Sequence, residues 1–126
     1  DHIAYLIKHA KYGDHIGVCM DTCHIHDAGF DLSDFDAILD EFDEKIGLDR
    51  LLCMHINDSK NIKGAKKDRH ANIGKGTIGY DTLHRLVHDE RFSDIPKILE
   101  TPWLCAEGEK KKTIPPYKEE IAWLLE

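Results

Sequence analysis

Four segments of the chain carry apolar residues at helical spacing, and we expect a helix in each. They are residues 3–10, residues 33–46, residues 80–89 and the segment that follows Pro115 and Pro116. Gly13 and Gly47 follow the first two segments, and a glycine commonly ends a helix. Ser33 with Asp36 three residues later predicts a capping box at the start of the second helix.

Three short apolar runs separate these helices, and they predict strands at residues 15–20, 51–56 and 96–100, where Pro96 can only begin a strand. The runs are apolar throughout, so we expect strands buried on both faces, as in a parallel α/β sheet or barrel. A complete eight-stranded barrel needs about 250 residues. The chain is therefore expected to be one segment, residues 1–126, forming about three βα units of a TIM-type (β/α)8 barrel.

Residues 57–78 follow neither the helical nor the strand period and are expected to form a long loop that is either functional or disordered. The loop carries six cations: Lys60, Lys63, Lys66, Lys67, Arg69 and Lys75. Glycines between them allow backbone amides to approach a phosphate closely, and the cations neutralise it. A solubilising surface is the ordinary alternative, but a phosphate-bearing substrate is favoured because candidate metal ligands flank these cations.

The overall composition narrows the class of protein. Hydrophobic residues make up 41% of the 126 residues and charged residues 33%, which is typical of a globular protein. There is no apolar run long enough for a membrane span and no signal-peptide pattern, and four cysteines without a paired motif favour the reducing cytoplasm. The net charge of −7 disfavours non-specific nucleic-acid binding except where cations gather locally. The absence of an initiator Met suggests a piece of a longer protein.

Nine histidines beside many carboxylates are the first indication of metal chemistry. Each predicted strand leads directly into a side chain that can bind a metal: Asp21, His55 or Glu100. A helix-capping carboxylate or a hydrogen-bonded core histidine would explain any one of them alone. All three together, at the carboxyl ends of strands where βα barrels build active sites, predict an Asp/His/Glu cluster for Zn²⁺ or Mn²⁺.

A second candidate set lies in the loops and comprises His24, Asp68 and His70. Asp68 and His70 are two residues apart, so an extended backbone turns both side chains to one side. His24 would close the site from the loop after the first strand. A salt-bridged, solvated loop is equally consistent with the spacing.

Four motifs in order resemble the C-terminal part of endonuclease IV, the zinc-dependent apurinic/apyrimidinic endonuclease family. They are GVCMDTCHIHDAGFDL, MHINDSKN, DRHANIGKGTIGYDTL and ILETPW. The resemblance covers almost the whole chain. It implies a βα barrel that holds three zinc ions and hydrolyses the phosphodiester 5′ to an abasic site in duplex DNA during base excision repair.

The resemblance also assigns roles. It implies that Asp21, His55 and Glu100 bind one zinc of a closely spaced pair, with Glu100 also acting catalytically by positioning metal and nucleophile. His24, Asp68 and His70 would be the complete ligand set of the third zinc. The family's other ligands would precede Asp1, so the isolated segment is expected to be inactive. Contacts to DNA phosphates are expected from Lys60, Lys66, Lys67, Arg69 and Lys75.

Two alternatives remain open. A metal-dependent sugar isomerase or epimerase of the xylose-isomerase-like barrel type would explain Asp21, His55 and Glu100, but it gives the second set and the cationic loop no role. A non-catalytic zinc-binding fragment is the other alternative, and its open edge strands could pair with a second copy. We expect the full-length protein to be a monomer without a membrane partner.

The remaining cysteines and histidines receive simpler interpretations. Cys23 could be a thiolate ligand, but a small buried filler is the preferred role, and the same holds for Cys19 and Cys53 in the strands. His26 is expected to be a solvent-exposed loop histidine. No serine or cysteine nucleophile is proposed.

Overall fold

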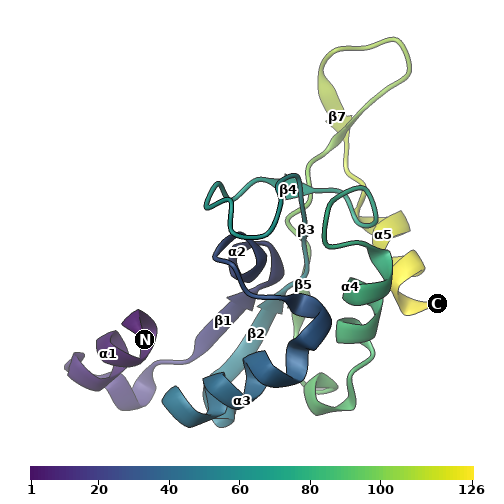
Figure 1. The fold of residues 1–126 in the computed structure, drawn as a ribbon. Coiled ribbons are helices and arrows are strands. Elements are labelled where there is room, and N and C mark those ends of the chain that lie inside the picture. Colours follow the sequence, from purple (N-terminus) through teal and green to yellow (C-terminus); the bar gives the residue numbers. More distant parts are fainter.

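A three-stranded parallel sheet forms the centre of the computed structural model, which describes residues 1–126 (Figure 1). Its strands lie in the order β1-β2-β5, with β1 at Val18–Asp21, β2 at Leu51–His55 and β5 at Lys97–Ile98. The three strands expected from the apolar runs are all present. The third is shorter than residues 96–100 because the backbone N–H of Glu100 donates to the Asn57 side chain instead of continuing the ladder.

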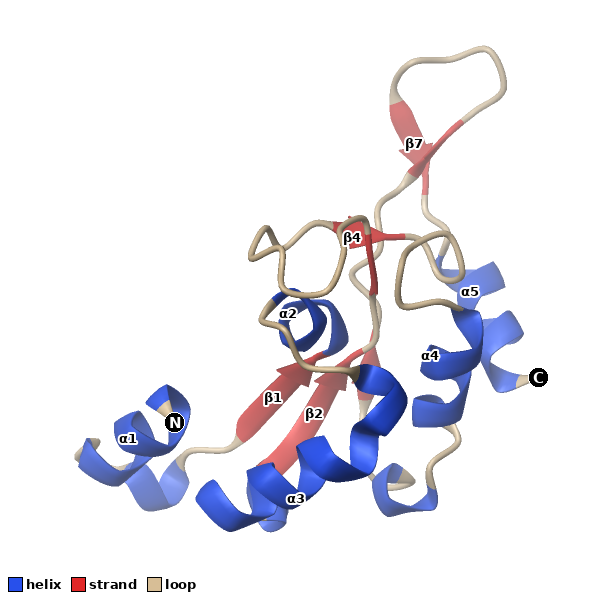
Figure 2. Cartoon of the chain, in the orientation of Figure 1, coloured by secondary structure: helices blue, strands red, loops and turns tan.

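The four expected helices are present, and a fifth was not expected (Figure 2). They are α1 at His2–His9, α2 at Thr22–Asp27, α3 at Phe35–Lys45, α4 at Tyr80–Val87 and α5 at Tyr117–Leu125. The unexpected helix is α2, whose six residues are too few to show a periodic apolar pattern. None of the five helices is both long and apolar enough to cross a membrane.

The start of α3 differs from the capping box expected at Ser33. A single turn of 3-10 helix at Leu32–Asp34 comes first, and Asp34 then caps α3 by accepting from the backbone N–H of Ala37. Asp31 caps the preceding turn in the same way, accepting from both the N–H and the hydroxyl of Ser33. Two adjacent caps therefore replace the single one, because Ser33 is itself the donor to Asp31.

The hydrophobic core lies between one face of the sheet and the helices α3, α4 and α5. Met20 and Met54 contribute from the strands, and Phe92, fully buried, packs edge-on against Phe35 with ring centroids 5.7 Å apart. The other core residues are Leu32, Ile38, Leu39, Leu51, Ile56, Ile73, Leu83, Leu86 and Leu124. This packing fixes the sheet relative to the helices on one side.

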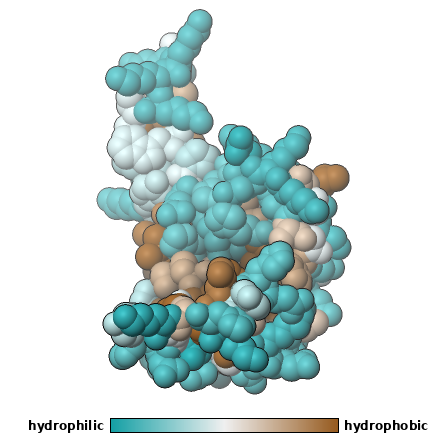
Figure 3. All heavy atoms as spheres, turned by 90° about the vertical axis from the view of Figure 1, so that its left-hand side faces the viewer, coloured by the Kyte–Doolittle hydropathy of each residue, from teal (hydrophilic) through white to brown (hydrophobic).

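The opposite face of the sheet is open, which contradicts the expectation of strands buried on both faces. Leu52 is 59% exposed and Ile98 is 45% exposed, and Cys19 is also exposed. Figure 3 shows apolar atoms at the surface on the side of the molecule that carries α1 and β1. The physical reason is that these 126 residues supply helices to one face only, while α1 buries none of its residues.

The expected long loop at residues 57–78 contains a small antiparallel ladder between β3 (Asp58–Ser59) and β4 (His70–Ala71). A second antiparallel pair was not expected: β6 at Leu104–Cys105 and β7 at Lys112–Ile114 form a hairpin that projects from the body (Figure 1). Its strands are exposed throughout and too short for a visible alternation of apolar and polar residues. Both ladders lie beyond the carboxyl ends of the parallel strands.

Candidate metal centre

The register of the parallel sheet brings the three strand-end side chains together. Asp21 on β1 pairs with His55 on β2, and His55 pairs with Ile98 on β5, two residues before Glu100. Residues two apart on an extended chain share a face, so Glu100 turns to the same side as Ile98. One ligand atom from each of Asp21, His55 and Glu100 lies within 4.8 Å of the other two.

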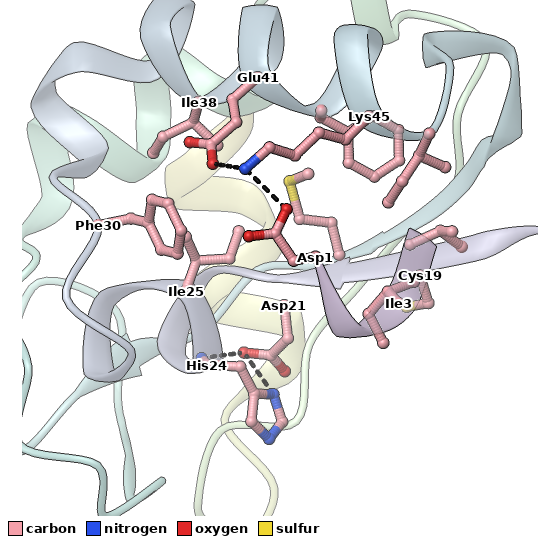
Figure 4. Close-up of a pocket in the computed structure, with 14 residues that line it drawn as sticks. Asp1, Ile3, Cys19, Asp21, His24, Ile25, Phe30, Ile38, Glu41 and Lys45 are labelled. Atoms are coloured by element: carbon pink, nitrogen blue, oxygen red, sulfur yellow. Dashed lines mark hydrogen bonds and ion pairs between the residues drawn. The ribbon is translucent and has the colours of Figure 1, made fainter. Parts of the chain in front are cut away.

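The distances within this Asp/His/Glu group are short. His55 Nδ1 lies 3.1 Å from Glu100 Oε2 and 3.5 Å from Asp21 Oδ2. Asp21 also caps α2, because its Oδ1 accepts from the backbone N–H of His24 at 3.1 Å (Figure 4). Asp21 can therefore cap α2 and bind a metal at the same time, since capping uses Oδ1 and Oδ2 faces His55.

The second set is also assembled, around the carboxylate of Asp68. Its Oδ2 lies 2.8 Å from His24 Nε2 and its Oδ1 lies 3.4 Å from His70 Nε2. The rings of the two histidines lie edge to face, with centroids 6.2 Å apart. The structure thus joins these residues in pairs through Asp68, and His70 Nε2 also lies 3.8 Å from Asp21 Oδ2 in the first group.

The hydrogen bonds of the His70 ring indicate which of its nitrogens could bind a metal. Its Nδ1 lies 3.0 Å from the carbonyl oxygen of Glu100, which can only accept, so Nδ1 carries the proton. In its neutral form the ring would present a lone pair at Nε2, an atom that is buried and has no hydrogen-bond partner. Its neighbours are the carboxylate oxygens of Asp68 and Asp21, which are also lone-pair donors. A cation between them would satisfy all three groups.

The charge of the centre supports the same interpretation. Asp21, Asp68 and Glu100 place three carboxylates in one region, and no lysine or arginine forms an ion pair with any of them. Their ion-pair partners are all histidines. Carboxylate oxygens and imidazole nitrogens in this mixture suit Zn²⁺ or Mn²⁺, with ligand distances of about 2.0–2.2 Å for zinc. The residues present therefore fit a divalent metal.

The whole chain, residues 1–126, matches the family model described as xylose isomerase-like TIM barrel. The chain belongs to this family. The fold class expected from the sequence is thereby confirmed, because the parallel βα order of these residues is that of a TIM barrel segment.

Other members of the xylose isomerase-like family resemble the chain closely, and the expected resemblance to endonuclease IV is confirmed. The chain is 53% identical to probable endonuclease 4 of Bacillus velezensis and 52% identical to that of Oceanobacillus iheyensis, matching the whole chain and 42% of each relative. The crystal structure of endonuclease IV from Thermus thermophilus superposes with a TM-score of 0.72 at 35% identity, over 98% of this chain and 42% of that one. The chain thus spans less than half the length of these relatives.

Asn57 connects Asp21 with Glu100, and its role was not predicted from the sequence. Its Nδ2 donates to Asp21 Oδ2 at 3.1 Å, and its Oδ1 accepts the backbone N–H of Glu100 at 2.8 Å. Its own backbone is held by reciprocal hydrogen bonds with the Thr22 hydroxyl. Asn57 and Thr22 are both fully buried. Their position directly after a strand end, next to a candidate ligand, was the available signal.

Asp58 organises the glycine-rich part of the loop and was also missed. Its fully buried carboxylate accepts hydrogen bonds from five backbone N–H groups, those of Ser59, Gly74, Gly76, Ile78 and Gly79. At Gly76 a Cβ atom would collide with this carboxylate and with the Ser59 carbonyl. The loop is therefore ordered by a buried anion, and this glycine is needed for its close approach.

Asp27 performs the same task for the lysine-rich part of the loop. Its Oδ2 accepts the backbone N–H of Asp68 at 2.7 Å, and its carbonyl accepts that of Lys66 at 3.0 Å. Both Lys66 and Asp68 have positive φ, which non-glycine residues adopt only when held. Asp27 is thus the residue that sets the direction in which Asp68 approaches the histidines.

The expectation that His26 is solvent-exposed is wrong. The side chain is buried at 8% exposure, and its Nε2 lies 2.9 Å from the Thr77 hydroxyl and 3.1 Å from the Asn61 carbonyl. The physical reason is that His26 lies in α2, which was not expected, on the side that faces the folded loop. It joins the two ends of that loop.

The cysteines divide into two kinds. Cys23 is fully buried, as expected of a filler, and its thiol donates to the Arg69 carbonyl, while burial raises the pKa of Cys23 to about 12. Cys19 is exposed and Cys53 is half-buried, so the expectation of buried fillers is wrong for both. They lie on the open face of the sheet. Desolvation there, followed by a hydrogen bond with Cys53, raises the pKa of Cys19 to about 11.

Proposed function

We propose that this chain is the metal-binding C-terminal part of a cytoplasmic DNA-repair endonuclease that hydrolyses the phosphodiester 5′ to abasic sites in duplex DNA. The observation that carries the proposal is the buried Nε2 of His70, which has no hydrogen-bond partner and faces two carboxylates that have no lysine or arginine partner. The names of the relatives support an endonuclease activity. Base excision repair is the process in which such an activity acts.

The proposed metal is zinc, three ions per full-length protein. Asp21, His55 and Glu100 would hold one ion with ligands from elsewhere in that protein, and His24, Asp68 and His70 would hold another. When bound, zinc supplies a Lewis acid for a phosphoryl oxygen and lowers the pKa of a bound water. Within this chain, Asn57 fixes the carboxylate of Asp21 and the backbone of Glu100, and the Glu100 carbonyl fixes the tautomer of His70.

The proposed DNA contacts come from the exposed cations of the loop around Asp68. Lys60, Lys66, Lys67, Arg69 and Lys75 are all exposed. The Arg69 side chain folds back on the loop, since its guanidinium donates to the backbone carbonyls of Lys67 and Asp68. Cations at these positions would neutralise phosphates without reading sequence, as an enzyme that acts at scattered lesions requires. An abasic nucleotide has no base to unstack, which lowers the cost of extruding it.

A chimera tests the activity. The chain would replace the matching segment of the Bacillus velezensis relative, and the product would be assayed for zinc-dependent nicking of a duplex with one abasic site. We expect nicking 5′ to the site by the chimera and none by the 126-residue chain alone. Turnover of an aldose or ketose instead of nicking, in a chimera whose circular dichroism matches that of the relative, would support the sugar isomerase alternative.

A substitution at His70 tests the role of the second set. In the chimera, His70→Ala is expected to reduce incision far more than duplex affinity, and to lower the zinc content from three ions to two. His9→Ala, on the exposed helix α1, is the matched control and is expected to change neither. A chimera that holds one zinc or none before substitution would contradict the ligand assignment.

A further inference from the structure

Glu120 is a buried carboxylate on helix α5, distant in the sequence from the candidate ligands. Its side chain is 7% exposed. Its Oε2 accepts the backbone N–H of Ile73 at 2.6 Å, and its Oε1 accepts the hydroxyl of Thr101. Ile73 and Thr101 are themselves fully buried. One carboxylate therefore joins two loop segments that come together only in the folded chain.

The two segments that Glu120 joins both carry candidate ligands. Thr101 directly follows Glu100, and Ile73 lies three residues after His70. The same two segments are connected at the ligands themselves, because His70 Nδ1 donates to the carbonyl oxygen of Glu100 at 3.0 Å. The hydrogen bond that orients the His70 ring therefore depends on how closely these segments approach each other.

Two further hydrogen bonds support the same arrangement. Asn72 Nδ2 donates to the carbonyl of Pro102 at 2.8 Å, which ties the segments a second time. The hydroxyl of Tyr117, on α5, donates to the carbonyl of Thr101 at 3.0 Å. Since residues three apart are neighbours on a helix surface, Tyr117 and Glu120 reach Thr101 from one side of α5. Figure 1 shows this helix beside α4, at the edge of the molecule remote from α1.

Stability alone is a poor explanation for a carboxylate at this position. No lysine or arginine forms an ion pair with Glu120. Burial of a carboxylate costs free energy that its hydrogen bonds must offset. What these two bonds provide is a fixed distance between the backbone at Ile73 and the side chain at Thr101. All of the groups involved belong to this chain.

We propose that Glu120 is a positioning residue for the metal centre. It acts through Ile73 and Thr101, and sets the distance between the segments that carry His70 and Glu100. At that distance the His70 ring donates to the Glu100 carbonyl and turns its Nε2 toward the carboxylates of the centre. The purpose of this positioning rests on the proposed function, in which these residues hold zinc.

Two substitutions at Glu120 separate geometry from charge. Glu120→Gln can keep both hydrogen bonds, since its oxygen accepts from Ile73 and its NH₂ group donates to the Thr101 hydroxyl, which can also accept. Glu120→Asp keeps the charge, but its side chain is one methylene shorter and cannot reach both partners. Glu119→Asp, at the exposed neighbour on α5, is the matched control.

The measurement is hydrogen exchange of the His70 Nδ1 proton, recorded by NMR in the metal-free chimera labelled with ¹⁵N-histidine. Glu120→Asp is expected to speed this exchange about tenfold, as the loss of one buried hydrogen bond would. Zinc affinity should fall by about tenfold, as it does when groups that orient metal ligands are removed. Glu120→Gln and Glu119→Asp should keep the parent's exchange rate and affinity.

The amide of Met54, in the parallel sheet, reports global unfolding in the same samples and should exchange as in the parent. Acceleration at Met54 by the same factor as at His70 would overturn the proposal, because the role would then be one of overall stability. Equal results for Glu120→Asp and Glu119→Asp would also overturn it. A loss in Glu120→Gln as large as in Glu120→Asp would do so too, since charge would then be responsible.

Thr101→Val deletes one of the two hydrogen bonds and takes the place of Glu120→Asp if that variant does not fold. It is expected to speed His70 exchange in the same way, and an unchanged rate would count against the proposal. Nicking is not used in this test. A chimera that shows these exchange rates but does not nick abasic duplex would refute the proposed function and leave the positioning role in place.

Discussion

At the scale of single residues, the sequence identifies the candidate ligands better than the residues that hold them. Asp21, His55 and Glu100 were predictable because each ends an apolar strand run, and parallel strands end at one edge. The roles of Asn57 and Asp58 were missed, because their partners are backbone groups and side chains brought near only by folding. Asp58 in particular reads as one more surface carboxylate in a charged loop.

Asp58 gives the first prediction. Asp58→Asn replaces one acceptor oxygen by an N–H₂ group that faces backbone N–H donors, so buried donors lose their partner. The free energy of unfolding is expected to fall by more than about 2 kcal/mol in urea titrations. Asp81→Asn, on the exposed side of α4, is the matched control and should change it by no more than about 0.5 kcal/mol. Equal values for the two variants would show that the loop does not depend on this anion.

At the scale of elements, periodicity predicted every helix long enough to show it and every strand of the parallel sheet. It failed for α2 and for the β6–β7 hairpin, because six residues and strands of two or three are shorter than the pattern that would reveal them. The apolar runs also led us to expect strands buried on both faces, because the sequence of a strand does not indicate whether other elements cover each face. The loop 57–78 proved ordered because carboxylates at Asp27 and Asp58 replace the missing apolar contacts.

Substitution of Phe92 tests the contact between the segment after α4 and helix α3. Its fully buried ring packs edge-on against Phe35, so Phe92→Ala leaves a cavity in the core. The free energy of unfolding is expected to fall by about 3–5 kcal/mol. Phe30→Ala removes the same atoms from a side chain that is 41% exposed and should cost much less. A similar loss from both variants would place the core elsewhere.

Asp89 makes the same segment sensitive to acid. Its carboxylate accepts hydrogen bonds from the guanidinium and the backbone N–H of Arg91, which lower the pKa of Asp89 below its ordinary 3.8. A carboxyl whose folded pKa is depressed stabilises the fold above its unfolded pKa, and this contribution is lost as pH falls. Asp89→Asn should therefore be less stable than the parent near about pH 7, and the gap should narrow near about pH 3. A gap independent of pH in urea titrations would refute this.

At the scale of the whole molecule the net charge is −7, whereas the loop at residues 57–78 is locally rich in positive charge. The carboxylates of the centre lie beside a loop that carries six cations, all exposed, so the side that presents the candidate ligands also presents most of the positive charge of the loop. Composition alone disfavours nucleic-acid binding, and only the position of the charges supports the proposed DNA contacts. The topology of the sheet was needed to show that both features share one end of the strands.

This arrangement predicts the salt dependence of DNA binding. Replacing Lys66, Lys67 and Arg69 together by Ala should reduce the slope of log affinity against log salt by about 0.9 for each duplex phosphate that the variant no longer neutralises. The matched control removes three exposed lysines at Lys8, Lys11 and Lys118, which carry the same total charge but lie on α1, just after it and on α5. Equal slopes for both triple variants, measured by fluorescence anisotropy, would remove the loop from the interface.

The pairing of Asp21 with His55 also limits how the chain can vary in length. Deleting one residue inside β2 would shift the side chains that follow by one position and exchange the inward and outward sets, so Ile56 would take the place of His55 on the open face. A deletion at the tip of the β6–β7 hairpin would move no ligand. A deletion should therefore be tolerated at the tip of the β6–β7 hairpin but not inside β2. A deletion scan that measures only folding can test this difference.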